Sequence, residues 1–181
     1  KLFDNKDSER YGGFMYRNSG NDNNILHFRD ALIQHIAGTG MDVDYMDYKP
    51  TIHFLNGEYW GIQNMREKID GDFIESNYGI SKDDIDMIEK YKTVIEGTDE
   101  AYRTYIENLQ LLDVTDPATF TYFDEHIDVQ EYINYLVTEI YFCNTDWPGN
   151  NMKFWRQRST NGKFRWILWD TDFGLGFNSN P

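Results

Sequence analysis

The stretch from Cys143 to Gly174 constrains the fold of this chain more than any other part of the sequence. It reads CNTDWPGNNMKFWRQRSTNGKFRWILWDTDFG. Two runs of strand-forming residues, 152–157 and 163–169, flank a turn-forming segment at 159–162, and this pattern predicts a β-hairpin. A loop with an acid and an amide precedes the hairpin, and two acids follow it directly. The rest of the chain therefore has to fold around a hairpin with polar groups at both of its ends.

Four of these polar residues suit phosphoryl transfer of the kind that protein kinases catalyse. Asp146 lies on the loop, where a carboxylate can accept the proton of an attacking hydroxyl. Asn151 follows five positions later, and Asp170 and Asp172 stand at the exit of the hairpin. Their hard oxygen atoms suit the divalent cations that bridge nucleotide phosphates. We therefore expect Asp146 to be the catalytic base and the other three residues to be metal ligands.

The alternative is that these residues only shape turns and strand ends. Asp, Asn, Gly and Pro are common in turns for local reasons, and Asp170 and Asp172 could be solvated where a strand stops. However, two carboxylates two positions apart in a strand would share a face, where they repel each other unless a cation or a proton intervenes. Together with the preceding loop, this repulsion favours a metal site.

Composition limits the partners of the chain. It has 181 residues, of which 17% are aromatic, enough for one domain or two small lobes that share a site. The formal net charge of -14 disfavours a nucleic-acid partner, because binding phosphate backbones needs clustered Lys and Arg. No apolar run approaches the roughly 18–20 residues of a membrane span. Because Lys1 is not an initiator Met and no signal peptide is visible, we expect a processed or excised piece.

The chain before the hairpin is expected to contain both strands and helices. Asn56-Gly57 between strand-like runs at 51–55 and 58–64 is a strong signal for a type I′ hairpin. Residues 25–38 read as a helix that ends at glycine. Its expected apolar face consists of Leu26, Ala31, Leu32, Ile36 and Ala37. The other elements expected before residue 128 are a strand at 13–17, a short helix at 71–78, a strand at 85–89, a helix at 98–111 and a helix that begins at Asp116-Pro117.

A further helix is expected to deliver Asp146 to the site. Asp128 would cap it, and it would run from Val129 to about Cys143. Its expected apolar stripe consists of Tyr132, Leu136, Ile140 and Cys143.

Several stretches together resemble the CotH kinase family, the atypical protein kinases of the spore-coat protein H type. They are RNSGND (17–22), FRDAL (28–32), PTIHFLNGEYWGIQNMREKID (50–70), NTDWPGNN (144–151) and WILWDTDFG (166–174). The resemblance implies a kinase-like fold with two lobes, and ATP with Mg²⁺ or Mn²⁺ as cofactors. It also implies a protein substrate with a Ser or Thr acceptor, and a secreted, bacterial cell-surface or spore-coat location.

The resemblance also assigns residue roles. Asp146 matches the acid of the catalytic loop and Asn151 its metal- and nucleotide-binding partner. Asp172 resembles the acid of the kinase Asp-Phe-Gly motif, whereas the family's Trp-Asp-x-Asp pattern keeps Asp170 equally in play. Arg17 lies where a strand-borne phosphate ligand is expected. Glu67 is either a ligand near the adenine side of the cleft or an exposed connector residue.

The chain departs from protein kinases at its start. Only about one strand precedes the helix at 25–38, with no Gly-rich loop and no clear strand-borne Lys. We therefore expect the central part of a larger domain, incomplete at both ends, which alone is a poor kinase.

The fold class that we predict is α+β and kinase-like. Residues 1–70 would form a smaller sheet-plus-helix lobe, 71–94 a connector, and 95–181 a helical lobe. The predicted function is ATP- and metal-dependent phosphorylation of Ser or Thr. The alternatives are a nonenzymatic binding or adhesion module and a metal-dependent phosphohydrolase.

Overall fold

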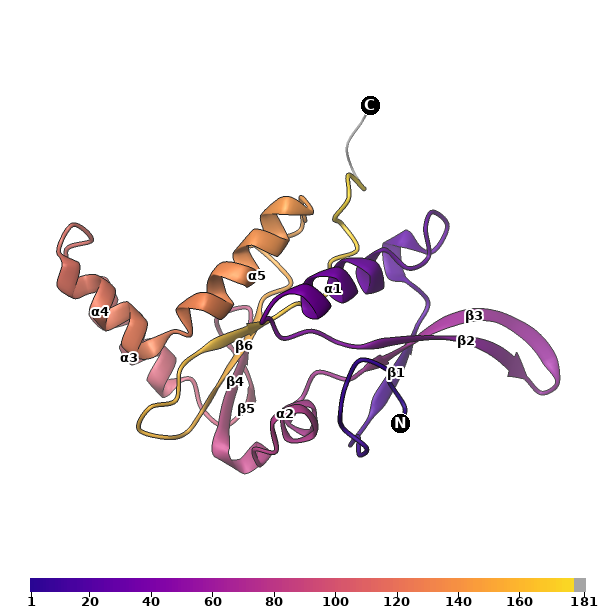
Figure 1. Ribbon diagram of the computed structural model, residues 1–181, viewed down its shortest axis with the longest axis horizontal. Coiled ribbons are helices and arrows are strands. Elements are labelled where there is room, and N and C mark those ends of the chain that lie inside the picture. Colours follow the sequence, from indigo (N-terminus) through magenta and orange to yellow (C-terminus); the bar gives the residue numbers. More distant parts are fainter. Residues whose placement is uncertain (178–181) are drawn as a thin grey trace.

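Two antiparallel β-sheets and five α-helices make up the computed structural model, which describes residues 1–177 (Figure 1). The predicted α+β class is therefore confirmed. Within residues 1–177, no helix is long and apolar enough to cross a membrane.

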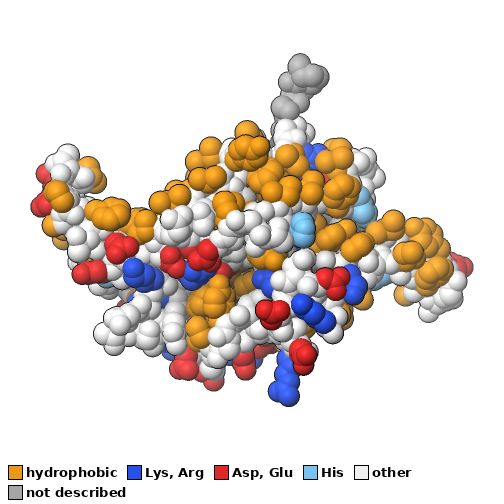
Figure 2. Space-filling model, viewed as in Figure 1, with side chains coloured by type: hydrophobic (Ala, Val, Ile, Leu, Met, Phe, Trp, Pro, Cys, Tyr) orange, Lys and Arg blue, Asp and Glu red, His pale blue; other side chains and the backbone are white. Residues whose placement is uncertain are grey.

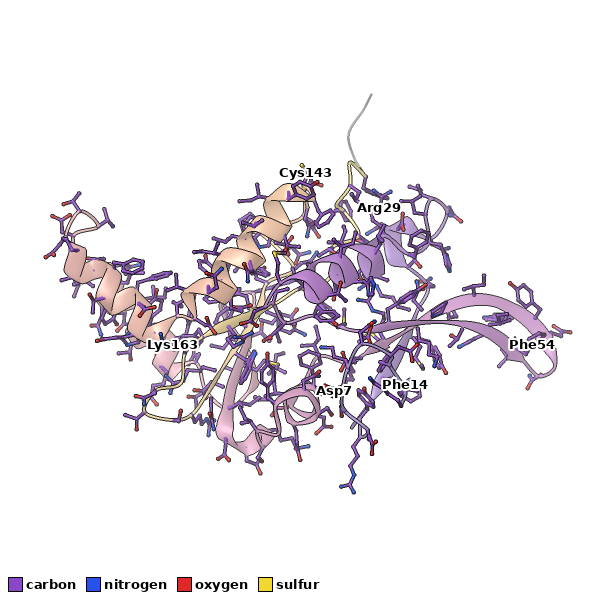
Figure 3. The ribbon with its side chains drawn as sticks, in the orientation of Figure 1. Asp7, Phe14, Arg29, Phe54, Cys143 and Lys163 are labelled. Atoms are coloured by element: carbon purple, nitrogen blue, oxygen red, sulfur yellow. The ribbon has the colours of Figure 1, made fainter. Side chains whose placement is uncertain are left out.

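The first sheet has the strand order β1-β3-β2, with β1 at Phe14–Arg17, β2 at Tyr48–Leu55 and β3 at Glu58–Glu67. Asn56 and Gly57 between β2 and β3 have φ angles of 51° and 85°. Positive φ at both central residues is what a type I′ turn requires, so the predicted hairpin is confirmed. The hairpin extends away from the rest of the molecule, with Phe54 near its tip (Figures 1 and 3).

Helix α1 (Arg29–Gly40) begins four residues later than predicted. The Asp22 carboxylate accepts hydrogen bonds from the backbone N–H groups of Leu26 and Arg29. His27 has a φ of 67°, which is incompatible with a right-handed helix. Segment 22–28, with the 3₁₀ turn η1 (Gly20–Asp22) at its start, therefore forms turns.

The predicted apolar face of this helix was wrong in part. Leu26 and Ile36 are exposed. The buried helix residues instead include three polar ones, Arg29, Asp30 and Gln34, whose hydrogen-bond partners lie on other segments or one turn away.

The second sheet has the order β5-β4-β6-β7. Its strands are β4 (Ile85–Glu89), β5 (Thr93–Glu96), β6 (Lys153–Gln157) and β7 (Arg165–Ile167). The predicted connector at 71–94 contains α2 (Gly71–Tyr78), η2 (Lys82–Asp84) and the whole of the internal strand β4. The division into lobes stays a prediction. The predicted hairpin at 152–169 is confirmed as the pair β6 and β7.

Helices α3 (Glu100–Leu109), α4 (Pro117–His126) and α5 (Val129–Tyr141) connect the edge strand β5 to the β6–β7 hairpin. The start of α4 after Asp116 and the cap of α5 by Asp128 were predicted, and the Asp116 and Asp128 carboxylates accept hydrogen bonds at the starts of the two helices. The stripe predicted for α5 was wrong at Ile140 and Cys143, which are exposed. The buried residues of α5 are Glu131, Tyr135, Thr138 and Glu139.

Segment 42–47 joins the two sheets. Asp44 pairs with Ile167 of β7 in an isolated parallel bridge, and its carbonyl accepts the N–H of Leu168. The Asp44 carboxylate accepts hydrogen bonds from Trp155 and Arg165 at 2.7 and 3.1 Å. These bonds link segment 42–47, which leads into β2 of the first sheet, to the β6–β7 hairpin that precedes Asp170 and Asp172.

Candidate active site at the exit of the β6–β7 hairpin

Arg17, the last residue of β1, points into a group of three carboxylates. Its guanidinium donates a hydrogen bond to Asp170. The same guanidinium lies 3.8 Å from an oxygen of Asp172 and 3.8 Å from an oxygen of Asp30. Strand β1, helix α1 and the segment that follows the β6–β7 hairpin therefore meet at the Arg17 guanidinium.

Asp30 lies at the bottom of this group and is buried. Its Oδ1 accepts hydrogen bonds from the Gln34 amide at 2.7 Å and from the Thr171 N–H at 2.8 Å, and its Oδ2 pairs with buried Arg66. Arg66 and Arg17, together with these hydrogen bonds, outweigh the effect of burial and lower the pKa of Asp30 to about 2. Asp30 is thus a fixed anion that links α1 to the segment between Asp170 and Asp172.

Asp170 and Asp172 were expected to share one face of a strand, but neither residue lies in a strand. Strand β7 ends at Ile167, and Asp170 has a φ of 54°. Burial and neighbouring carboxylates nevertheless raise both pKa values, that of Asp172 to about 6. Burial is the largest cause for both groups, and Asp170 contributes to the rise of the Asp172 pKa.

The turn after β1 contacts Asp172 directly. The backbone N–H of Asn21 donates to Asp172 Oδ2 at 3.1 Å. A Cβ on Gly20, which has a φ of 54°, would lie only 2.7 Å from the same oxygen. Glycine at this position therefore allows the turn to approach the carboxylate.

The loop between α5 and β6 brings Asp146 and Asn151 to the acids. The Asn151 amide donates to Asp146 Oδ2 at 2.9 Å and to the Asp170 carbonyl at 3.2 Å. Because Nδ2 makes both bonds, the side-chain oxygen of Asn151 is left as an acceptor. Asn150 also donates to Asp146 Oδ2, at 2.9 Å. Asp146 itself is half-buried.

Buried polar residues that the sequence did not single out support this loop and the residues after Asp172. Glu139 on α5 accepts a hydrogen bond from Asn144 at 2.8 Å, and burial raises the pKa of Glu139 to about 7. Arg29 pairs with Asp22 and donates to the Gly174 carbonyl at 2.7 Å. In the sequence, the only signal for these residues is that a charged or amide side chain interrupts an otherwise apolar helix pattern.

Glu67 lies in a different network. It is buried at the end of β3, so the exposed-connector alternative was wrong. Its carboxylate accepts hydrogen bonds from the Asp47 N–H at 2.8 Å and the Asn77 amide at 2.9 Å, and Lys6 lies 3.7 Å away. These contacts hold the segment between β3 and α2, and its role as a nucleotide ligand stays a prediction.

Lys153 and Trp169 form a second cationic contact beside the acids. Lys153 is buried, its ammonium lies 4.4 Å from the centre of the Trp169 ring, and burial lowers its pKa. The Arg17 guanidinium lies 5.9 Å from the same ring. The Trp169 ring therefore lies near two cations next to the carboxylates.

The donor set fits a hard divalent cation that a nucleotide helps to hold. The Asp170 and Asp172 carboxylates lie together at Arg17, and Mg²⁺ is usually bound through one or two carboxylates plus substrate phosphates. Within residues 1–177, no three Asp, Glu, His or Cys side chains gather into a group that could hold a metal by themselves. Asp170, Asp172 and Asn151 could therefore supply only part of the ligands that a metal needs.

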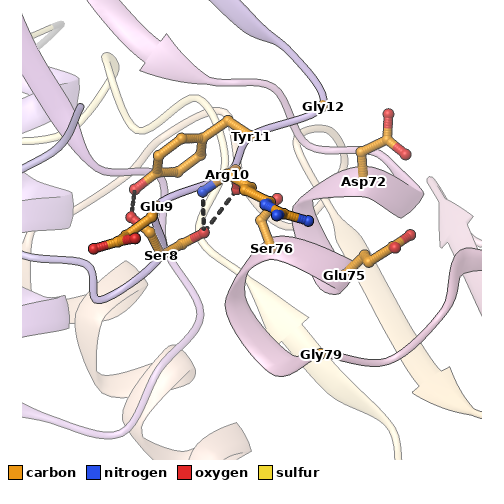
Figure 4. Close-up of a pocket in the computed structure, with 9 residues that line it drawn as sticks. All are labelled: Ser8, Glu9, Arg10, Tyr11, Gly12, Asp72, Glu75, Ser76 and Gly79. Carbon is orange, nitrogen blue, oxygen red and sulfur yellow. Dashed lines mark hydrogen bonds between the residues drawn. The ribbon is translucent and has the colours of Figure 1, made fainter. Parts of the chain in front are cut away.

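A cavity of about 640 Å³ lies elsewhere, between residues 8–12 and helix α2 (Figure 4). Asp72, Glu75 and Arg10 line it, and none of the site residues described above does. Under Arg17 the void is only about 10 Å³, because Asp30, Arg66 and their neighbours fill the space. The base of the acid group is therefore rigidly packed.

A family model described as CotH kinase protein matches residues 3–180 of the chain. The match covers almost the whole sequence and includes every block on which the resemblance rested. No curated protein matches the chain.

Proposed function

The chain belongs to the CotH kinase family, and on that premise we propose that it transfers the γ-phosphoryl group of ATP to a Ser or Thr hydroxyl of a protein substrate. The observation that carries the proposal is the meeting of Arg17, Asp170 and Asp172 with the Asp146–Asn151 loop. Arg17 comes from a part of the sequence far from the other residues, and together they would supply a base, metal ligands and a phosphate ligand.

Asp146 is the proposed catalytic base. Its carboxylate is held by two amide donors, Asn150 and Asn151, so its orientation is fixed before a substrate arrives. It would take the proton from the Ser or Thr hydroxyl while that oxygen forms a bond to the γ-phosphorus and the bond to the β-phosphate oxygen breaks. ADP is the leaving group, and the proton remains on Asp146 until solvent accepts it.

The other residues would bind and orient the nucleotide. Asn151, Asp170 and Asp172 would hold Mg²⁺ or Mn²⁺, which would neutralise the charge of the nucleotide phosphates. Arg17 would donate to the phosphates, a task that suits its planar fork of N–H groups. The family name points to a spore-coat or other secreted or surface protein as the substrate.

The test measures phosphoryl transfer in Asp146→Asn. A positioned base contributes roughly 10²–10⁴-fold in rate, so we expect a loss of that size with an unchanged melting temperature. Asp124→Asn is the matched control, because it makes the same change in charge at a side chain that is 54% exposed on α4. Transfer in Asp146→Asn at the parent rate would show that another group is the base.

The assay should also separate the two alternatives. Free phosphate without phosphoprotein would identify a phosphohydrolase. Failure to bind any metal–nucleotide complex would identify a nonenzymatic binding module. Because the sequence has no Gly-rich loop before β1, both the 181-residue chain and a chain extended at both ends should be assayed with the same substrate.

A further inference from the structure

Arg17 holds the place beside Asp170 and Asp172 that a cation would take. We propose that Arg17 is an internal counter-ion of these carboxylates, which opposes binding of a divalent metal alone and yields to a metal–nucleotide complex. This inference rests on the proposed function, because it assigns the metal to Asp170 and Asp172 and the phosphates to Arg17.

The three carboxylates around Arg17 do not depend on its positive charge equally. Asp30 already has a partner in buried Arg66. The charge of Arg17 is therefore available to the other two acids, and its guanidinium bonds to Asp170 while it lies 3.8 Å from Asp172. A divalent ion that enters here meets a carboxylate already bonded to a cation, and it is itself repelled by the guanidinium.

Asp170 depends on Arg17 more than Asp172 does. Among the described residues, Arg17 is the side-chain partner of the Asp170 carboxylate. Asp172 in addition accepts the N–H of Asn21. When Arg17 leaves, Asp170 therefore becomes an open ligand, whereas Asp172 stays held in place by the turn.

The phosphates of a nucleotide would offer Arg17 a new partner. A guanidinium pairs with phosphate oxygens through two parallel N–H bonds, and such bonds are among the strong ones in proteins. When a metal arrives with phosphates, the metal thus replaces the positive charge that Asp170 and Asp172 lose, and the phosphates provide the acceptors that Arg17 needs. Metal and nucleotide should consequently bind with positive coupling through Arg17.

A purely structural ion pair predicts a different result. If Arg17 only stabilised the fold, its removal would leave the affinity for a metal unchanged or would weaken it. If Arg17 is a counter-ion, its removal should change the two affinities in opposite directions. It should strengthen binding of the metal alone and weaken binding of the nucleotide.

The experiment measures Mn²⁺ binding by electron paramagnetic resonance, with and without the nonhydrolysable analogue AMP-PNP, on the 181-residue chain. In Arg17→Gln we expect Mn²⁺ alone to bind about 10- to 100-fold more tightly, the factor that corresponds to loss of a charge-assisted hydrogen bond. The enhancement of Mn²⁺ binding by AMP-PNP should shrink at the same time. Arg17→Lys keeps the charge and should lie between the parent and Arg17→Gln.

Arg103→Gln is the matched control, because it removes an Arg whose side chain is 61% exposed and pairs with Asp99 on the same helix turn. It should bind both ligands as the parent does. If Arg17→Gln, folded by its melting curve, binds Mn²⁺ no more tightly than the parent while the parent binds Mn²⁺ with AMP-PNP, the inference is overturned and the proposed function stands. A parent that binds no Mn²⁺ with AMP-PNP overturns both.

Discussion

Replacing Asp30 by Asn should destabilise the protein strongly, although the side chain keeps its shape. In the variant, Oδ1 can still accept from Gln34 and Thr171. The new amide nitrogen would face the guanidinium of Arg66, which would lose its carboxylate partner inside the protein. Removing one member of a buried ion pair costs about 3–5 kcal/mol, a large part of the 5–15 kcal/mol that is typical of whole domains.

Urea unfolding followed by tryptophan fluorescence measures this loss. The double variant Asp30→Asn, Arg66→Met is the control, because removing both charges avoids an unpaired buried cation and should recover part of the stability. If the double variant loses the full sum of the two single losses, the buried pair is not the cause and the reasoning fails.

The same carboxylate predicts part of the acid sensitivity of the protein. Folding lowers the pKa of Asp30 from 3.8 to about 2, so protonation favours the unfolded chain. The resulting contribution of about 2 kcal/mol is fully present above pH 4 and is lost as the pH falls through 2. Asp30→Asn should therefore show a smaller loss of stability between pH 4 and pH 2 than the parent does.

Three further changes have outcomes that follow from single contacts. Gly20→Ala should lower the free energy of unfolding by about 1–2 kcal/mol, because φ is positive and the new Cβ would lie 2.7 Å from Asp172; an unchanged melting temperature would refute this. Glu139→Gln should raise stability at pH 8 by about 3 kcal/mol, because burial raises the pKa of Glu139 from 4.5 to about 7 and the parent loses stability as the pH rises through that interval; the same gain at pH 4 would contradict the linkage. Asn144→Ala removes the hydrogen bonds to Glu139 and to the Asp146 N–H and should cost about 1–3 kcal/mol, as guanidinium titration would show.

Local signals in the sequence predicted the elements well. The Asn56-Gly57 turn and the caps at Asp116 and Asp128 depend on neighbours in the chain, and each is found where its pattern indicates. The pairing of β4 with β6 joins segments far apart in the sequence, and no local pattern encodes it. The buried faces of α1 and α5 were misjudged for the same reason.

For the candidate site, too, the sequence could predict what depends on local patterns but not what depends on contacts between distant segments. Motif spacing predicted that Asp146, Asn151, Asp170 and Asp172 lie near one another, because loop and hairpin lie together in the chain. The hydrogen bonds that hold Asp30 could not be predicted with them, because its partner Thr171 is 141 positions away. A buried acid needs donors or cations to pair with, and the remote partners of Asp30, Arg66 and Thr171, become visible when the fold is known.

The projecting β2–β3 hairpin should make the solubility of this protein depend on salt. Its exposed apolar side chains are Ile52, Phe54, Leu55, Tyr59, Trp60 and Ile62 (Figure 2), and β2 is an edge strand with an open backbone. At low ionic strength the net charge of -14 keeps molecules apart. At about 0.1 M salt the screening length falls to about 10 Å, so hairpins of two molecules can approach. Light scattering should therefore detect self-association that increases with added NaCl, and a charged residue at Phe54 should suppress it.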